Sequence, residues 1–143
     1  MQNSLSFMLF CAVSVALSSC SNSGRFYIKN ESLQDVRVNL NNFEFGIAVG
    51  KNSKKYRITR QNAQFSAIIS NCNYVYSGID WFSGAKEEDL VNSDDRNLPL
   101  LLELSIGNDA TLKAFVVNRS DGVRIREIIS YGFPLVPSKK TCL

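Results

Sequence analysis

The chain contains no histidine, and this absence limits the chemistry that its 143 residues can perform. Histidine is the usual general base, the commonest metal ligand and a member of most catalytic triads. Carboxylate pairs are the remaining acid–base candidates, and Glu87-Glu88 is one of them. Adjacent residues do not face each other on a helix and point to opposite faces of a strand, so this pair is no hydrolytic dyad. We expect a protein without catalytic activity or cofactor, with a carboxylate-dependent hydrolase as the alternative.

An acidic segment offers oxygen ligands for a hard cation. Residues 80–95 contain six carboxylates and a single lysine. The candidate ligands within this segment are Asp89, Asn92, Asp94 and Asp95. Carboxylate and amide oxygens suit calcium, but the D-x-D-x-D-G order and the distal glutamate of calcium loops are missing. Calcium is therefore a weak candidate, and we expect no bound metal.

A basic segment is the clearest candidate for binding. Residues 51–60, KNSKKYRITR, contain no acid. The cations are Lys51, Lys54, Lys55, Arg57 and Arg60. They predict a surface for anionic lipid headgroups, lipopolysaccharide phosphates or an acidic protein, or else a solvated strand edge that lysines protect from pairing. The net charge of +3 is too small to indicate a nucleic-acid partner.

The first twenty residues read as a targeting signal. Residues 5–17, LSFMLFCAVSVAL, form an uncharged apolar run of 13 residues. A bilayer-spanning helix needs about 20 residues, so this length is typical of a signal peptide. The next residues complete the motif Leu17-Ser18-Ser19-Cys20, which resembles the lipobox of bacterial lipoprotein precursors. The resemblance implies that residues 1–19 are removed and that Cys20 carries diacylglyceryl and palmitate groups, with secretion without lipidation as the alternative.

The same resemblance carries expectations about location and role. Ser21, rather than aspartate, follows Cys20, which in that family favours the outer membrane, here facing the periplasm. The segment FEFGIAVGKNSKKYRITR loosely resembles small all-β envelope lipoproteins of unassigned role. We therefore expect a non-catalytic binding or accessory module, such as an assembly factor or an immunity-type inhibitor. Its partners would be the membrane, through the acyl anchor, and a protein of the envelope.

Cysteine parity agrees with lipidation. After removal of residues 1–19, three of the four cysteines remain, and an exported protein with an odd cysteine needs an explanation. Lipidation of Cys20 leaves Cys72 and Cys142 as an even pair in an oxidising compartment. We therefore expect a disulfide between Cys72 and Cys142 that closes a loop of about 70 residues.

Strands are the elements that must position these residues. Apolar and polar residues alternate, as in Val36, Val38 and Leu40, and Asn41-Asn42 suits a tight hairpin turn. The expected strands are residues 25–29, 36–40, 43–49, 55–60, 63–69, 74–81, 99–106, 111–117 and 123–129, with a short helix at 85–91. We predict an all-β domain over residues 25–143 after a lipidated tether at 20–24. Its fold is expected to be an antiparallel β-sandwich of immunoglobulin-like or transthyretin-like type, or a small barrel, with about nine short strands.

Overall fold

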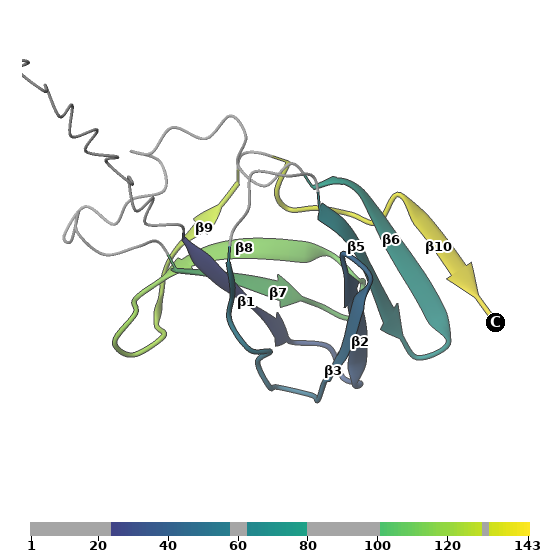
Figure 1. Cartoon of the computed structure of the whole chain (residues 1–143), viewed down its shortest axis with the longest axis horizontal. Helices are drawn as coiled ribbons and strands as arrows, with labels where there is room; N and C mark the ends of the chain where they lie inside the picture. Colours follow the sequence, from purple (N-terminus) through teal and green to yellow (C-terminus); the bar gives the residue numbers. More distant parts are fainter. Residues whose placement is uncertain (1–23, 58–62, 80–100, 130–131) are drawn as a thin grey trace, which may run out of the picture.

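The computed structural model describes residues 24–57, 63–79, 101–129 and 132–143, which contain ten strands (Figure 1). The strands are β1 (Arg25–Asn30), β2 (Val36–Leu40), β3 (Phe43–Ile47), β4 (Tyr56–Arg57), β5 (Ala63–Ile69), β6 (Cys72–Ile79), β7 (Leu101–Ile106), β8 (Leu112–Val117), β9 (Arg124–Ile128) and β10 (Lys139–Cys142). They form two five-stranded sheets, with the orders β4-β1-β7-β8-β9 and β10-β6-β5-β2-β3. The predicted sandwich is confirmed, and within the described ranges neither sheet closes into a barrel.

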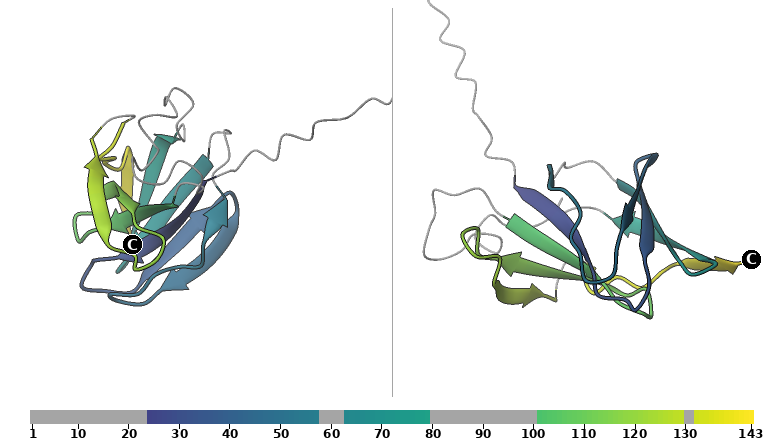
Figure 2. Two further views of the ribbon diagram at one scale, coloured as in Figure 1. Left: turned by 90° about the vertical axis from the view of Figure 1, so that its left-hand side faces the viewer. Right: turned by 90° about the horizontal axis from the view of Figure 1, so that it is seen from below.

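The two sheets pack face to face with their strands at a steep angle. In Figure 1, β7 and β8 lie roughly horizontally, whereas β2 and β3 lie roughly vertically. Viewed from below, β10 and the C-terminus project from one end of the molecule (Figure 2). The described residues contain no helix that is long and apolar enough to cross a bilayer. The expected helix at 85–91 lies outside the described residues.

The alternation of apolar residues located most strands closely. The bounds of β2 and β5 are the predicted ones, and both central residues of the Asn41-Asn42 turn have the expected positive φ, 50° and 66°. β10 was missed because its sequence, KKTC, has no apolar alternation and all four residues are exposed. The expected strand 55–60 is described only as β4, Tyr56–Arg57.

The prediction of a wholly antiparallel sandwich is wrong for one pair of strands. β1 lies parallel to β7, with Phe26 opposite Leu102 and Ile28 opposite Leu104. Parallel neighbours require a long crossover connection, and the chain between β1 and β7 forms most of the other sheet. An alternating pattern defines the two faces of a strand but not the direction of its neighbour.

The inward faces of both sheets form one hydrophobic core. Val36 and Val38 from one sheet and Leu102, Leu104 and Ile106 from the other are fully buried in it. On the opposite face of β7, Leu101, Glu103 and Ser105 are also buried. A second apolar cluster lies on this outer face; it comprises Tyr27, Leu101, Phe115 and Val117. The outer face of this sheet therefore also carries buried side chains that pack together.

A bulge in β9 changes the orientation of its side chains. Val123 and Ile125 alternate with arginines in the sequence, yet they are 59% and 45% exposed. Val116 lies opposite Arg126 and Val117 opposite Arg124, which leaves Ile125 without a partner position. Beyond such an extra residue, each side chain of the strand points to the opposite face of the sheet from the one it would otherwise take. The bulge therefore turns Arg124 toward the outer face that carries Val117.

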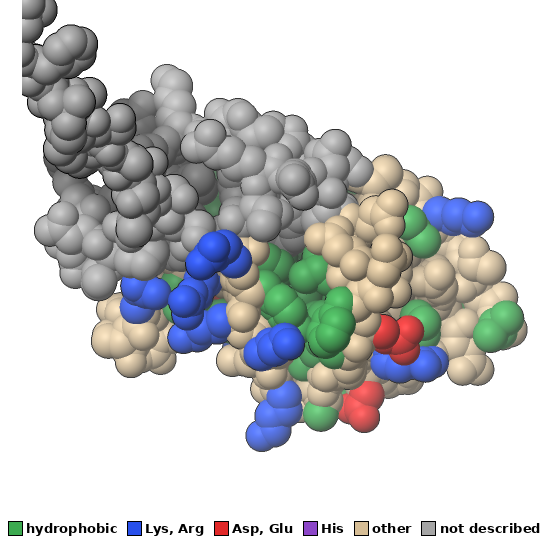
Figure 3. Space-filling view, in the orientation of Figure 1, with side chains coloured by type: hydrophobic (Ala, Val, Ile, Leu, Met, Phe, Trp, Pro, Cys, Tyr) green, Lys and Arg blue, Asp and Glu red, His purple; other side chains and the backbone are tan. Residues whose placement is uncertain are grey.

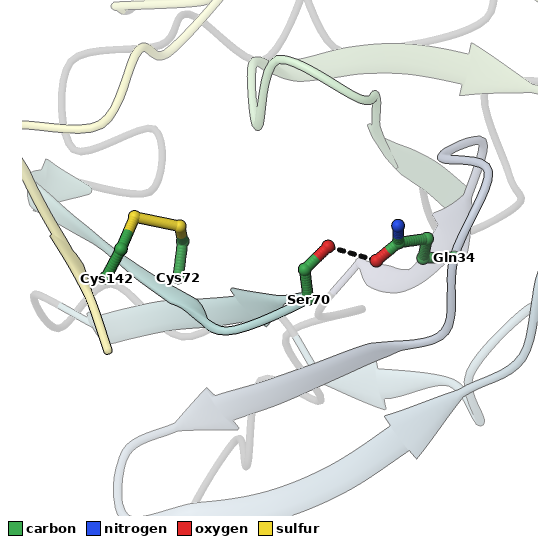
Figure 4. The surroundings of a disulfide bond; sticks show 4 residues. All are labelled: Gln34, Ser70, Cys72 and Cys142. Atoms are coloured by element: carbon green, nitrogen blue, oxygen red, sulfur yellow. Dashed lines mark hydrogen bonds between the residues drawn. A yellow bond between two sulfur atoms is a disulfide. The ribbon is translucent and has the colours of Figure 1, made fainter.

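The predicted disulfide between Cys72 and Cys142 is confirmed (Figure 4). The two residues lie directly opposite each other on β6 and β10, with Cα atoms 4.0 Å apart. Next to the bond, the backbone N–H of Leu143 donates to the carbonyl oxygen of Asn71 at 3.0 Å. The bond thus fixes the end of the chain to the hairpin between β5 and β6.

Candidate functional site

The predicted basic residues lie along one edge of the first sheet. Lys51, Lys54 and Lys55 lie between β3 and β4, and Arg57 lies on β4. Arg25 extends the group, because it is the cross-strand partner of Arg57 at the start of β1. We call Arg25, Lys51, Lys54, Lys55 and Arg57 the basic strip; all five are exposed. Arg60, the fifth predicted cation, lies outside the described residues.

Aromatic side chains run beside the basic strip. Ring centroids are 5.5 Å apart for Phe26 and Tyr56, 5.2 Å for Tyr56 and Phe45, and 5.9 Å for Phe45 and Phe43. The row begins in the core and ends at Phe43, which is 51% exposed. The Lys54 ammonium lies 4.8 Å from the centroid of Phe43 and 5.6 Å from that of Tyr56. Figure 3 shows apolar side chains beside lysine and arginine side chains on this face.

Cation–π contacts hold Lys54 at this aromatic row. An ammonium within about 6 Å of a ring centroid is attracted by the ring, by about 0.5–1 kcal/mol at exposed sites. The hydroxyl of Tyr56 is buried and has no hydrogen-bond partner among the described residues, and burial raises its pKa. The neutral hydroxyl leaves the positive potential of the strip intact. The resulting surface combines exposed cations, one of them held against aromatic rings, with an exposed ring.

A second cluster of charged groups lies on the outer face of the same sheet. We call Tyr27, Glu31, Glu103, Ser105 and Arg124 the Glu103 cluster. The hydroxyl of Tyr27 donates to Glu103 Oε2 at 2.8 Å, and Arg124 Nε donates to Glu103 Oε1 at 2.7 Å. Arg124 Nη2 also donates to Glu31, and the Ser105 hydroxyl donates to the other oxygen of Glu31. The guanidinium lies 3.9 Å from the ring centroid of Phe115.

The groups of the Glu103 cluster are paired with one another. Glu103 is only 3% exposed, and each of its oxygens accepts a hydrogen bond. Burial raises the pKa of Tyr27, and its hydrogen bond to Glu103 raises it further, so this phenol stays neutral. A buried carboxylate is stable when it is paired and hydrogen-bonded. The geometry therefore supports a structural role that links β1, β7 and β9.

Sequence reasoning missed the Glu103 cluster. One signal was present, because Glu103 is the only acid in the apolar segment LLELSI of β7. Its partner Arg124 could not be assigned from the sequence, since the bulge in β9 brings it to this face. The predicted calcium ligands Asp89, Asn92, Asp94 and Asp95 lie outside the described residues. Within the described part of the chain, no group of histidine, cysteine and acidic side chains forms a metal site.

The Glu31 carboxyl makes stability depend on pH. Burial alone would raise its pKa, but the Ser105 hydrogen bond and the charge of Arg124 hold it below the usual value. The stabilisation is complete above the pKa of the unfolded chain and is lost as the pH falls through the lower folded pKa. Water screens this side chain, which is 36% exposed, so we expect about 0.5 kcal/mol. The free energy of unfolding, measured with urea, should fall less steeply with decreasing pH for Glu31→Gln than for the wild type. An unchanged slope contradicts the assignment.

Compared with known proteins, the chain matches no family model, no curated protein and no solved structure. The fold and the two clusters therefore define its class: a two-sheet β-sandwich with a basic, aromatic edge and an internally paired charge cluster.

Proposed function

We propose that this protein is a lipid-anchored binding module of the bacterial envelope that acts without catalysis. The observation that carries the proposal is the pairing of Cys72 with Cys142. Once residues 1–19 are removed, this bond leaves Cys20 as the one cysteine of the chain outside a disulfide. Cys20 is also the residue that the Leu17-Ser18-Ser19-Cys20 motif designates for acylation. Two or three acyl chains anchor a protein stably, whereas one does so only marginally.

The distribution of polar groups supports binding as the mode of action. The charged groups of the Glu103 cluster are hydrogen-bonded within the cluster, whereas the cations of the basic strip are exposed to solvent. Recognition would therefore use the open edge of the sandwich, next to the anchored end of the domain. The proposed location is the outer membrane, on the periplasmic side, where an envelope protein can also be a partner; its basis is the resemblance at Ser21 after Cys20.

Labelling with radioactive palmitate tests the anchor. We expect the full-length chain, expressed in a bacterium, to carry the label and to fractionate with membranes. Cys20→Ser should lose both properties because it lacks the thiol that is acylated. Cys11→Ser is the matched control and should keep both, since Cys11 lies in the segment that is removed. An unlabelled wild-type protein in the soluble fraction would reject the anchor and leave plain secretion.

A further inference from the structure

We propose that the basic strip and Phe43 form a docking surface for the anionic phospholipid headgroups of the membrane that holds the acyl anchor. The inference rests on the proposed function for the nearness of the membrane. The surface itself is defined by the described residues and can be tested without the anchor. It adds a partner and an orientation: the start of β1 and the edge strand β4 face the bilayer.

The length of the tether brings this edge to the membrane. Only residues 21–24 separate Cys20 from Arg25, the first residue of β1. Five peptide steps span at most about 18 Å when fully extended. The anchor therefore keeps Arg25 within about 18 Å of the acylated residue, and Arg57 lies directly opposite Arg25 on the neighbouring strand. The part of the sandwich that lies nearest the membrane is thus a strongly basic part.

The charges of the strip favour an external anion. Within the described ranges, no carboxylate lies at ion-pair distance from any of the five cations. Lys29 and Arg37, by contrast, are paired with Glu31 and Glu44. Arg25 and Arg57 lie directly opposite each other, and like charges in that position destabilise a strand pair. Lipid phosphates at this edge would relieve the repulsion.

Phe43 suits the apolar part of a membrane interface. Half of its side chain is exposed, and the other half is held by Phe45 and by the ammonium of Lys54. Peripheral proteins commonly combine an aromatic ring that enters the interface with cations that stay at the headgroups. Lys54 on the ring of Phe43 provides both groups at one point. An acidic protein would satisfy the cations but leave the exposed ring without a role.

Vesicle binding by residues 21–143 tests the proposal. This chain includes every described strand, the core and the disulfide, but not Cys20. We expect it to sediment with phosphatidylcholine vesicles that contain about one-third phosphatidylglycerol, to ignore pure phosphatidylcholine and to be released by high salt. Each lysine near such a surface strengthens binding about five-fold. Lys54→Glu with Lys55→Glu should therefore weaken binding by roughly 30-fold or more.

A second lysine pair provides the matched control. Lys139 and Lys140 on β10 are also adjacent and exposed, and Lys140 also lies over an aromatic ring, 5.4 Å from the centroid of Tyr74. Lys139→Glu with Lys140→Glu makes the same change in net charge and should keep binding within about two-fold. Equal losses of vesicle binding in the two double variants would overturn the proposal, because binding would then depend on net charge and not on the position of the charges in the basic strip.

Two further results decide between partners. Phe43→Ser keeps every charge and should weaken vesicle binding about five-fold, because it removes the ring that enters the interface. Its circular dichroism spectrum checks the fold.

A wild-type chain that does not bind anionic vesicles but binds poly-glutamate through Lys54 and Lys55 would overturn the proposal in favour of an acidic protein partner. The palmitate experiment is independent, so failure of the docking surface and failure of the anchor are distinguishable.

Discussion

Replacing Arg124 with methionine is expected to destabilise the domain by about 3–5 kcal/mol, because it leaves a buried carboxylate without its cation. Glu103 is 3% exposed and, among the described residues, would retain only the hydroxyl of Tyr27 as a partner. Methionine keeps an apolar side chain of similar length, so the loss reports the guanidinium charge, including its contact with Phe115, rather than the packing. Urea unfolding followed by circular dichroism measures the change in the free energy of unfolding.

An exposed ion pair is the control for Arg124. Arg37 Nη1 lies 3.6 Å from Glu44 Oε1, and both side chains are more than half exposed. Arg37→Met should cost less than about 1 kcal/mol, since surface pairs contribute little. Combining Arg124→Met with Glu103→Leu should recover much of the stability, because the uncompensated charge is removed. A loss for Arg124→Met no larger than that for Arg37→Met would contradict a structural role for the cluster.

Features that depend on neighbouring residues in the chain could be predicted from the sequence. The alternation in Val36, Val38 and Leu40 defines β2 because burial of one face requires apolar residues at every second position. Asn41 and Asn42 mark the hairpin because asparagine tolerates positive φ. Cysteine parity identified the pair Cys72 and Cys142 without any knowledge of the fold. The cations between residues 51 and 57 were visible as a run.

Features that depend on the register of distant strands could not be predicted. The bulge opposite Val117 decides which face receives Arg124, and no local pattern encodes it. β1 and β7 are separated by most of the second sheet, so their parallel pairing is invisible to periodicity. Arg25 joins Arg57, and Phe43 joins Lys54, only through such pairings and contacts. The basic strip was therefore predicted only as a charged segment, and the aromatic row beside it was missed.

Removing the disulfide with Cys72→Ser and Cys142→Ser is expected to destabilise the protein by about 4 kcal/mol on the chain-entropy model. The bond joins residues 70 positions apart, so it restricts the unfolded chain strongly. β10 should respond most, because its four side chains are exposed and contribute no burial to hold it. Its backbone pairing with β6, the adjacent hydrogen bonds of Ser138 and Leu143 and the contact of Lys140 with Tyr74 would remain. Hydrogen exchange at residues 139–142 and urea unfolding measure the local and global effects.

Thr141→Ala supplies the comparison within the same strand. This residue is exposed and lies outside the disulfide, so its replacement should change the free energy of unfolding by no more than about 0.5 kcal/mol. Rapid exchange in β10 together with protected amides in β5 and β2 would show that the bond holds a terminal strand on an otherwise complete sandwich. A loss below about 1 kcal/mol with unchanged exchange in β10 would mean that backbone pairing alone fixes the strand. The bond would then be dispensable to the folded domain.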